Sequence, residues 1–404
     1  MEKITFDVKN FGGLEEIQKI SLQHGTPCYI YSQSLLEKNF QAYAQHSSNE
    51  LICVAIKANS NPVLLNLLGE KGAGADVVSG GELRRALDAG IDAQKIVFSG
   101  VGKTAKEIAY AIDQQIYSIN VESEQELEQI AKIANEKKQT ARVSFRLNPN
   151  VDAKTHPKIA TGMYENKFGI DEESVFAMYE KSSKQKYVEP VGIHFHLGSQ
   201  IFSRSPYEKA LSEAFKLIEK INAQGFTIEF LNVGGGVGLR EASDDEHIQA
   251  IEEHMQSIRN ALQGKNIRLL LEPGRSIFGN AGLLLSKVLY TKKNQKKEFV
   301  IIDAGMNDYM RPALYEAKVN AFVLGKENSP KRTIDLVGPV CESTDTFGKD
   351  MELSECEPGD LIALSHVGAY GYSMSSQYNL RPRPSEHMWD GERFVILREP
   401  TIET

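Results

Sequence analysis

Two residues whose types could do chemistry close short apolar runs in this sequence. Lys57 ends LICVAIK, and Glu272 follows the apolar part of IRLLLEP, directly before Pro-Gly-Arg. A lysine amine can bond a carbonyl carbon, and a carboxylate can keep a nearby nitrogen protonated. Each has a plainer interpretation alone, because a lysine at the end of an apolar run is usually a solvent-facing charge and a glutamate there is often a loop-edge carboxylate.

Further candidates lie at the ends of other apolar runs. Asp76 opens one run, and His194 and His196 lie two residues apart in VGIHFHL, a spacing that puts both on one face of a strand. A lone histidine there is more often part of the core, and a glycine triplet is usually a tight turn. The other candidates are Ser199, Gly234, Gly235, Gly236, Gly274 and Arg275.

The elements that must position these residues alternate between residues 50 and 275. The apolar runs are LICVAIK (51–57), ADVV (75–78), KIVFS (95–99), IYSIN (116–120), ARVSFRL (141–147), VGIHFHL (191–197), IEFLNV (228–233) and IRLLLEP (267–273). Between them, stretches such as SEQELEQIAKIANEKK have apolar residues at helical spacing. Eight strands that alternate with helices predict a (β/α)8 TIM barrel, although an open doubly wound sheet has the same alternation. The position of the unusual residues, at the C-terminal strand ends, favours the barrel.

The pattern changes after about residue 276. The runs EFVIIDA, RTIDLVG, DLIALS and ERFVILRE are typical of strands, with turns between them. The early runs ITFDV and PCYIYS could pair with these strands. The expected fold class is therefore α/β plus β: a barrel at 30–276 and a second, mostly antiparallel β domain from 1–29 and 277–404.

The glycine triplet after the seventh strand and the Gly-Arg pair after the eighth occupy the usual phosphate site of such a barrel. Arg275 can add charge-assisted hydrogen bonds to a phosphate. Lys57 offers an amine that Asp76 could orient, His196 offers a ring for stacking, and Glu272 can protonate a ring nitrogen. This combination predicts pyridoxal 5'-phosphate as the cofactor.

Composition excludes several other classes. The net charge is −8 with no basic stripe, which argues against a nucleic-acid partner. No apolar run approaches the roughly 20 residues that span a membrane. The start, MEKITFDVKN, does not resemble a secretory signal. The four cysteines are scattered, which argues against a metal cage or a disulfide framework and for a reducing compartment. We expect a cytoplasmic protein without a metal.

Several motifs carry a family resemblance that runs from about residue 25 to about residue 385. They are VAIKANSNP, DVVSGGEL, NPNVDAKTHPKIATG with NKFGI, GIHFHLGSQI, NVGGGVG, LEPGRS, DAGMNDYMRPALY, GPVCESTDTFGKD and GAYGYSMSSQYN. In this order they resemble the diaminopimelate decarboxylase family. That family belongs to the fold-type III pyridoxal phosphate group, with ornithine decarboxylase, arginine decarboxylase and alanine racemase.

The resemblance implies roles for the barrel residues. Lys57 matches the Schiff-base lysine, His196 the residue that stacks on the ring, and Glu272 the partner of the pyridine nitrogen. Arg275 matches a residue that contacts both the phosphate and the substrate. The other matches to the phosphate site are Ser199, Gly234, Gly235, Gly236 and Gly274.

The resemblance also implies roles beyond residue 276. Arg311 and Tyr315 match contacts to substrate carboxylates, and Glu342 matches a contact to the distal ammonium. Tyr370 matches a residue near both phosphate and substrate. Cys341 matches the thiol that returns a proton after carbon dioxide leaves. Because this cysteine comes from the neighbouring subunit in the group, the resemblance implies an obligate head-to-tail homodimer with shared sites.

The implied function is decarboxylation of meso-2,6-diaminopimelate to L-lysine, the last step of lysine biosynthesis. A sister decarboxylase acting on ornithine, arginine or a carboxylated polyamine is an alternative, but it should lack Arg311 in MRPALY. An alanine racemase pairs the pyridine nitrogen with arginine, unlike Glu272. A silent cofactor-binding regulator should have lost Lys57 or Cys341.

One segment departs from the family pattern. After Cys341 and Glu342 the chain reads STDTFGKD, so Thr344 replaces a glycine and Asp345 follows it. The sequence therefore does not determine the path of this loop. It also does not determine whether His194 has a role in the site besides packing in the core.

Overall fold

The computed structural model describes residues 6–44, 49–152, 167–239 and 243–401. These residues form two compact units. One unit contains Phe40–Gly238 and Ile248–Ser276, and the other contains Met1–Asn39, Leu239–His247 and Ile277–Thr404. We describe each unit by itself. The domain boundaries expected from the sequence, at residues 30 and 276, stay a prediction.

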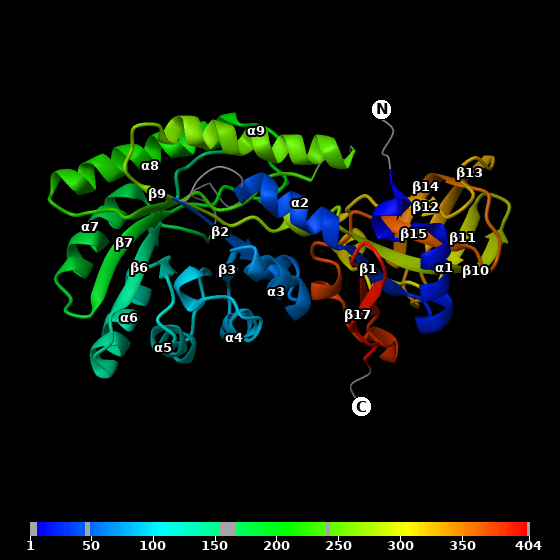
Figure 1. The fold of residues 1–404 in the computed structure, drawn as a ribbon, viewed down its shortest axis with the longest axis horizontal. Helices are drawn as coiled ribbons and strands as arrows, with labels where there is room; N and C mark the ends of the chain where they lie inside the picture. The colour runs from blue at the N-terminus through cyan, green and yellow to red at the C-terminus, as the bar shows by residue number, and fades with distance from the viewer. Residues whose placement is uncertain (1–5, 45–48, 153–166, 240–242, 402–404) are drawn as a thin grey trace. The chain divides into compact units, whose positions relative to one another are not determined.

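The first unit is a closed barrel of parallel strands, β2 to β9 in chain order, and the expected TIM barrel is confirmed. Figure 1 shows its helices on the outside of the strands. The strands are β2 (Glu50–Ala55), β3 (Gly74–Val77), β4 (Ile96–Phe98), β5 (Ser118–Val121), β6 (Ala141–Arg146), β7 (Val188–His194), β8 (Phe230–Asn232) and β9 (Arg268–Leu271).

The helices of the barrel begin where the sequence supplies caps. Ser79 and Ser123 each accept a hydrogen bond from the third helical backbone N–H, and Thr104 forms a capping box with Glu107. None of the described helices is long and apolar enough to cross a membrane. The helices are α3 (Pro62–Glu70), α4 (Gly80–Asp88), α5 (Ala105–Asp113), α6 (Glu124–Lys137), α7 (Glu172–Ser183), α8 (Ser205–Ala223) and α9 (Asp244–Leu262), whose first residues count with the second unit.

Each of the eight expected runs overlaps one barrel strand, but two candidate residues lie beyond their strands. Lys57 does not end β2, because Ile56–Ala58 form a 3-10 turn, η2, after the strand. His196 is not on β7, which ends at His194. The strand ends there because His194 is its last residue in register with β8, opposite Asn232. Both residues therefore lie in the loops that form the mouth of the barrel.

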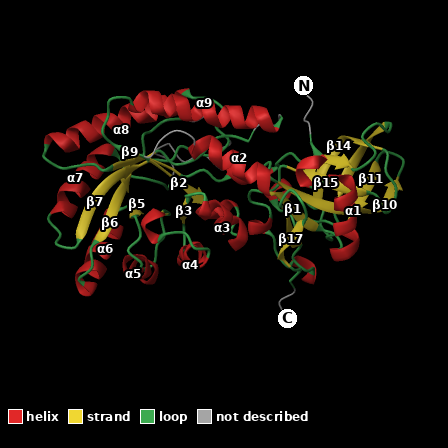
Figure 2. Cartoon of the chain, viewed as in Figure 1, coloured by secondary structure: helices red, strands yellow, loops and turns green. Residues whose placement is uncertain are grey.

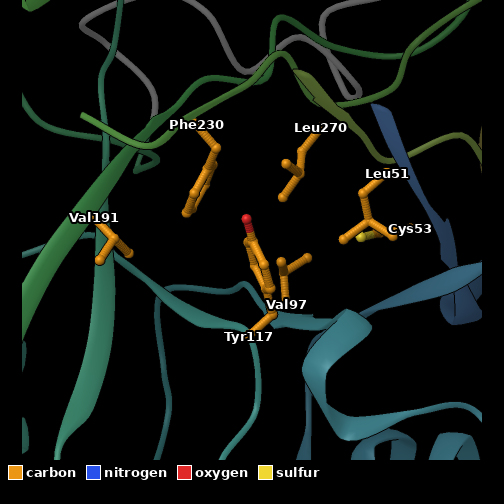
Figure 3. Packing of buried hydrophobic residues seen from close by; sticks show 7 residues of the cluster. All are labelled: Leu51, Cys53, Val97, Tyr117, Val191, Phe230 and Leu270. Carbon is orange, nitrogen blue, oxygen red and sulfur yellow. The ribbon is translucent and has the colours of Figure 1, made fainter. Parts of the chain in front are cut away.

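The interior of the barrel is filled by side chains. Figure 3 shows seven of them gathered between the strands, among them Tyr117 and Phe230, whose ring centroids are 5.3 Å apart. Phe230 packs against Gly192, where a Cβ atom would lie 2.4 Å from the phenyl ring. The cluster consists of Leu51, Cys53, Val97, Tyr117, Val191, Phe230 and Leu270.

The second unit is rich in strands, drawn yellow in Figure 2. Its sheet has the order β14-β13-β11-β10-β1-β16-β17, and β15 pairs with β10 and β12. Six of its eight strand pairings are antiparallel, which confirms the expected mostly antiparallel domain. The strands are β1 (Cys28–Ser32), β10 (Gly282–Lys293), β11 (Glu298–Ile302), β12 (Asn320–Val323), β13 (Lys331–Val337), β14 (Thr346–Ser354), β15 (Leu361–Ser365), β16 (Ser385–Trp389) and β17 (Phe394–Arg398).

The N-terminal segment contributes to this sheet only in part as expected. The run PCYIYS supplies β1, which lies between β10 and β16. The run ITFDV begins outside the described residues, and its described part forms no strand. Asp7 instead caps a 3-10 helix, η1 (Val8–Phe11), which is followed by the C-cap residue Gly12 with a φ of 97°. The remaining helices are α1 (Gly13–His24), α2 (Gln33–Ala44), α10 (Arg275–Phe278) and α11 (Arg311–Tyr315).

Packing in the barrel interior predicts a large effect of one truncation. Phe230→Ala removes a fully buried ring that no neighbour can replace, so we expect it to lower the free energy of unfolding by about 3–5 kcal/mol. Phe202→Ala is the matched control, because Phe202 is 57% exposed and should change stability by less than about 1 kcal/mol. Urea unfolding followed by circular dichroism measures both, and equal effects would contradict the packing argument.

Candidate active site

Lys57 and Asp76 form an ion pair at the mouth of the barrel. The Nζ atom of Lys57 donates to Oδ2 of Asp76 at 2.8 Å. The carboxylate is fully buried, whereas 39% of the lysine side chain is exposed. Burial and repulsion by Glu272 raise the pKa of Asp76, and attraction to Lys57 opposes that rise. The pair therefore holds an accessible amine in the turn that follows β2.

Glu272 follows β9 directly and lies at the centre of a buried polar network. Its Oε1 atom accepts from Nδ2 of Asn232 at 2.7 Å and from Nδ2 of Asn120 at 3.2 Å. Its Oε2 atom lies 3.3 Å from Nε2 of His194, and both side chains are nearly inaccessible. Ser99 also reaches Oε1, at 3.5 Å. The two oxygens of Glu272 therefore face different partners.

This network decides the charge of Glu272. Burial alone would raise its pKa, but attraction to His194 and Lys57 outweighs burial and holds the pKa well below the usual range of a carboxyl group. The carboxylate is thus ionised at neutral pH. An ionised, desolvated carboxylate is a suitable partner for a protonated ring nitrogen.

His196 presents a neutral ring at the same mouth. Burial, with repulsion by Arg146 and Lys57, lowers the pKa of His196 to about 3. Its Nδ1 atom accepts a hydrogen bond from the backbone N–H of Gly235 at 3.2 Å. This hydrogen bond fixes the imidazole beside the glycine loop, where an uncharged ring can stack on another flat ring.

The glycine loop after β8 packs too closely for side chains. A Cβ atom on Gly235 would lie 2.2 Å from the carbonyl oxygen of Glu272. Gly236 has a φ of +114°, and a Cβ there would lie 2.5 Å from the carbonyl oxygen of Gly198. Tyr207 adds support by donating to the carbonyl of Gly235 at 2.8 Å. The chain therefore needs glycine at these positions.

Arg275 completes this side of the mouth. It follows Gly274 after β9 and donates from Nε to Oγ of Ser199 at 3.2 Å. The guanidinium of Arg275, the hydroxyl of Ser199 and the glycine loop at 234–236 thus come from three segments that lie next to one another. Together with the amine of Lys57 and the ionised Glu272, this donor set has the chemistry to hold pyridoxal phosphate.

Three candidate residues of the second unit lie together. The guanidinium carbon of Arg311 is 5.6 Å from the ring centroid of Tyr315 and 5.7 Å from that of Tyr370. Tyr370 has a φ of 58°, a left-handed backbone conformation that is uncommon for a bulky residue. The cluster offers a cation and two phenol groups to an anionic ligand.

The loop after β13 presents Cys341 and Glu342, both exposed. Its base is tied down by Asp345, whose side-chain oxygens accept from the backbone N–H groups of Met306 and Val340, each at 2.6 Å. Thr344 has no left-handed backbone, so a side chain fits where the resemblance led us to expect glycine. The departure in this segment leaves the Cys-Glu pair on an ordered loop.

Sequence reasoning missed the polar residues that surround Glu272. Asn120 and Ser99 end apolar runs, and Asn232 is the next-to-last residue of another, which is nearly the same signal that identified Lys57. Polar residues at three C-terminal strand ends of one barrel predict a shared polar cluster. The structure also gives His194 a partner, the carboxylate of Glu272, where the sequence left its role open.

Comparisons with known proteins agree with this geometry. A family model described as the pyridoxal binding domain of pyridoxal-dependent decarboxylases matches residues 33–279. A diaminopimelate decarboxylase from Aquifex aeolicus is 43% identical over 383 residues, which are 95% of this chain and 91% of that protein. One from Helicobacter pylori strain J99 is 46% identical over 380 residues, 93% of both chains. The crystal structure of the Helicobacter pylori enzyme complexed with L-lysine has a TM-score of 0.89 and 45% identity, and the match covers 95% of this chain and 96% of that one.

These relatives span both units of the chain, and their similarity extends well beyond the barrel. The match therefore includes the segments that carry Arg311, Cys341 and Tyr370 as well as the mouth with Lys57 and Glu272. The chain belongs to the diaminopimelate decarboxylase family of pyridoxal phosphate-dependent carboxy-lyases.

Proposed function

We propose that this protein converts meso-2,6-diaminopimelate to L-lysine and carbon dioxide in the last step of lysine biosynthesis, in the cytoplasm. The observation that carries the proposal is the buried carboxylate of Glu272, which accepts hydrogen bonds from Asn232 and Asn120 in the mouth that also presents Lys57. A carboxylate at this position supports decarboxylation, because it keeps the ring nitrogen of the cofactor protonated. The relatives that match over both units bear the name of this activity.

The residues of the barrel mouth would hold the cofactor. When bound, pyridoxal phosphate supplies a protonated ring that accepts the electron pair released as the carboxylate leaves. Lys57 would bond its carbonyl carbon, and Asp76 would keep that lysine charge-balanced and oriented. His196 would lie against the ring, and Glu272 would bind the ring nitrogen. The phosphate would be held by Ser199, Gly234, Gly235, Gly236, Gly274, Arg275 and Tyr370.

The substrate carries an amino acid at each end, and charged side chains would recognise both ends. Arg275, Arg311, Tyr315 and Tyr370 would bind its carboxylates, and Glu342 would bind the distal ammonium. Ornithine lacks the distal carboxylate, so it would leave a guanidinium without its partner in a desolvated site. Such an unpaired buried charge is costly and gives selectivity.

Cys341 would return a proton to the carbon that has lost its carboxylate. Its thiol is exposed in the single chain, as expected for a group that acts at a surface between subunits. We therefore propose a head-to-tail homodimer in which each site combines Lys57 of one chain with Cys341 of the other.

Parallel assays of three substrates test the function. We expect the purified protein to release carbon dioxide from meso-diaminopimelate and not from ornithine or arginine. Lys57→Arg keeps a cation beside Asp76 but cannot perform the amine chemistry, so its rate should fall by at least about 10³-fold. Faster release from ornithine, or an active Lys57→Arg variant, would contradict the proposal.

A second variant tests the charge of Glu272. Glu272→Gln keeps the shape of the side chain but removes its charge, so kcat should fall by about 10²-fold or more while borohydride still fixes the cofactor to Lys57. The lowered pKa of Glu272 also predicts that its titration produces no acid limb in the pH profile near neutrality. The matched control is Glu229→Gln, because Glu229 is an exposed carboxylate paired with Arg142. A Glu272→Gln variant as active as this control would refute the role.

Subunit mixing tests the shared site. Cys341→Ala should retain the absorbance of bound cofactor, whereas its kcat falls by about 10²-fold or more. When this variant is unfolded, mixed with Lys57→Ala and refolded, half-site complementation should restore roughly a quarter of the wild-type activity. Refolded single variants serve as controls. A mixture no more active than its components would exclude sites shared between chains.

A further inference from the structure

Two hydroxyl groups hold the carboxylate of Glu342, one on each oxygen. The Oγ1 atom of Thr344 donates to Oε2 at 3.0 Å, and the phenol of Tyr378 donates to Oε1. The hydrogen bond from Tyr378, and to a smaller extent that from Thr344, lowers the pKa of Glu342. An otherwise exposed and flexible side chain is therefore held in one orientation by two neutral donors.

The backbone around this carboxylate is fixed independently of the two hydroxyls. Asp345 is 3% exposed, and its side chain ties Val340 and Met306 together through their backbone N–H groups. The backbone N–H of Asp345 also donates to the carbonyl of Glu342 at 3.1 Å. Because the loop is anchored in this way, loss of the Thr344 hydroxyl should free the side chain of Glu342 without moving its backbone.

Thr344 stands where the family pattern has glycine, which has no side chain to donate. The backbone at this position is not left-handed, so threonine is accommodated without strain. Its hydroxyl also lies 3.6 Å from the sulfur of Met306, a weak acceptor that leaves Glu342 as the stronger partner. The substitution thus adds one donor next to a carboxylate that would contact the substrate.

We propose that Thr344 is a positioning residue for substrate recognition: together with Tyr378 it orients Glu342 toward the distal ammonium of the substrate. This inference rests on the proposed function. A carboxylate that is already ordered loses less side-chain entropy when the ammonium binds. The effect should therefore appear in the binding of the distal amino group and not in the bond-breaking step.

Three substitutions at one position separate the hydroxyl from the shape of the side chain. Thr344→Val keeps the branched shape without the donor, Thr344→Ser keeps the donor, and Thr344→Gly restores the family residue. For meso-diaminopimelate we expect Thr344→Val and Thr344→Gly to raise KM by roughly three- to tenfold, with kcat changed less than about twofold. Thr344→Ser should remain close to the wild type. Thermal melting of each variant with bound cofactor checks that the fold is intact.

A ligand that lacks the distal amine provides the decisive comparison. 2-Aminopimelate has the same chain and carboxylates, and its inhibition constant against meso-diaminopimelate should be unchanged by Thr344→Val. An equal loss for both ligands would show a general disturbance of the loop, and no loss for either would show that the hydroxyl is irrelevant. Each of these results overturns the inference. Failure of the proposed function can be distinguished from failure of this inference. In the first case the wild-type protein itself releases no carbon dioxide from meso-diaminopimelate.

Discussion

A carboxylate that is removed from water must be surrounded by donors, and the mouth of this barrel is organised around one such group. Leaving an ionised Glu272 without partners would cost several kcal/mol, roughly the whole margin of stability of a domain. Asn120 and Asn232 on two different strands donate to one oxygen, while His194 faces the other. Polar residues that would weaken an ordinary barrel core are thus required here by the charge that they surround.

This constraint extends to the glycine loop and to the lysine. The backbone of Gly235 passes against the carbonyl of Glu272, so the segment that would bind phosphate and the segment that carries the carboxylate pack as one piece. Lys57 contributes to the low pKa of Glu272 and is itself paired with Asp76. The electrostatics therefore couple the two ends of the cofactor site: a change at one carboxylate alters the proton affinity of the other.

The sequence was sufficient for the barrel and for most residues of its mouth, because apolar runs and their C-terminal ends are local signals. It misplaced Lys57 and His196 by about a residue or two, since the end of a strand depends on its neighbour, as the pairing of His194 with Asn232 illustrates. It missed the role of Asn120, whose partner Glu272, directly after β9, is distant in the chain. The described part of the ITFDV run forms no strand, because Asp7 caps a 3-10 helix that begins at Val8.

The hydrogen bond from Tyr378 to Glu342 could not be predicted from the sequence either, because the two residues are 36 positions apart in the chain. Resemblance to a family identifies the carboxylate of Glu342 but not the hydroxyl groups that hydrogen-bond to it. One of these groups, on Thr344, lies where the sequence departs from the expected family pattern.

The short turn η2 has a mechanical consequence. The sheet ends at Ala55, whose backbone N–H is bonded to the carbonyl of Pro273, and Lys57 stands on the next turn of the chain. The side chain of Lys57 can therefore change rotamer by rotation about its methylene groups without breaking a backbone hydrogen bond of the barrel strands. Strand β2 and the side chain of Lys57 are adjacent in the chain, yet a change in the side-chain rotamer leaves the pairing of the strand intact.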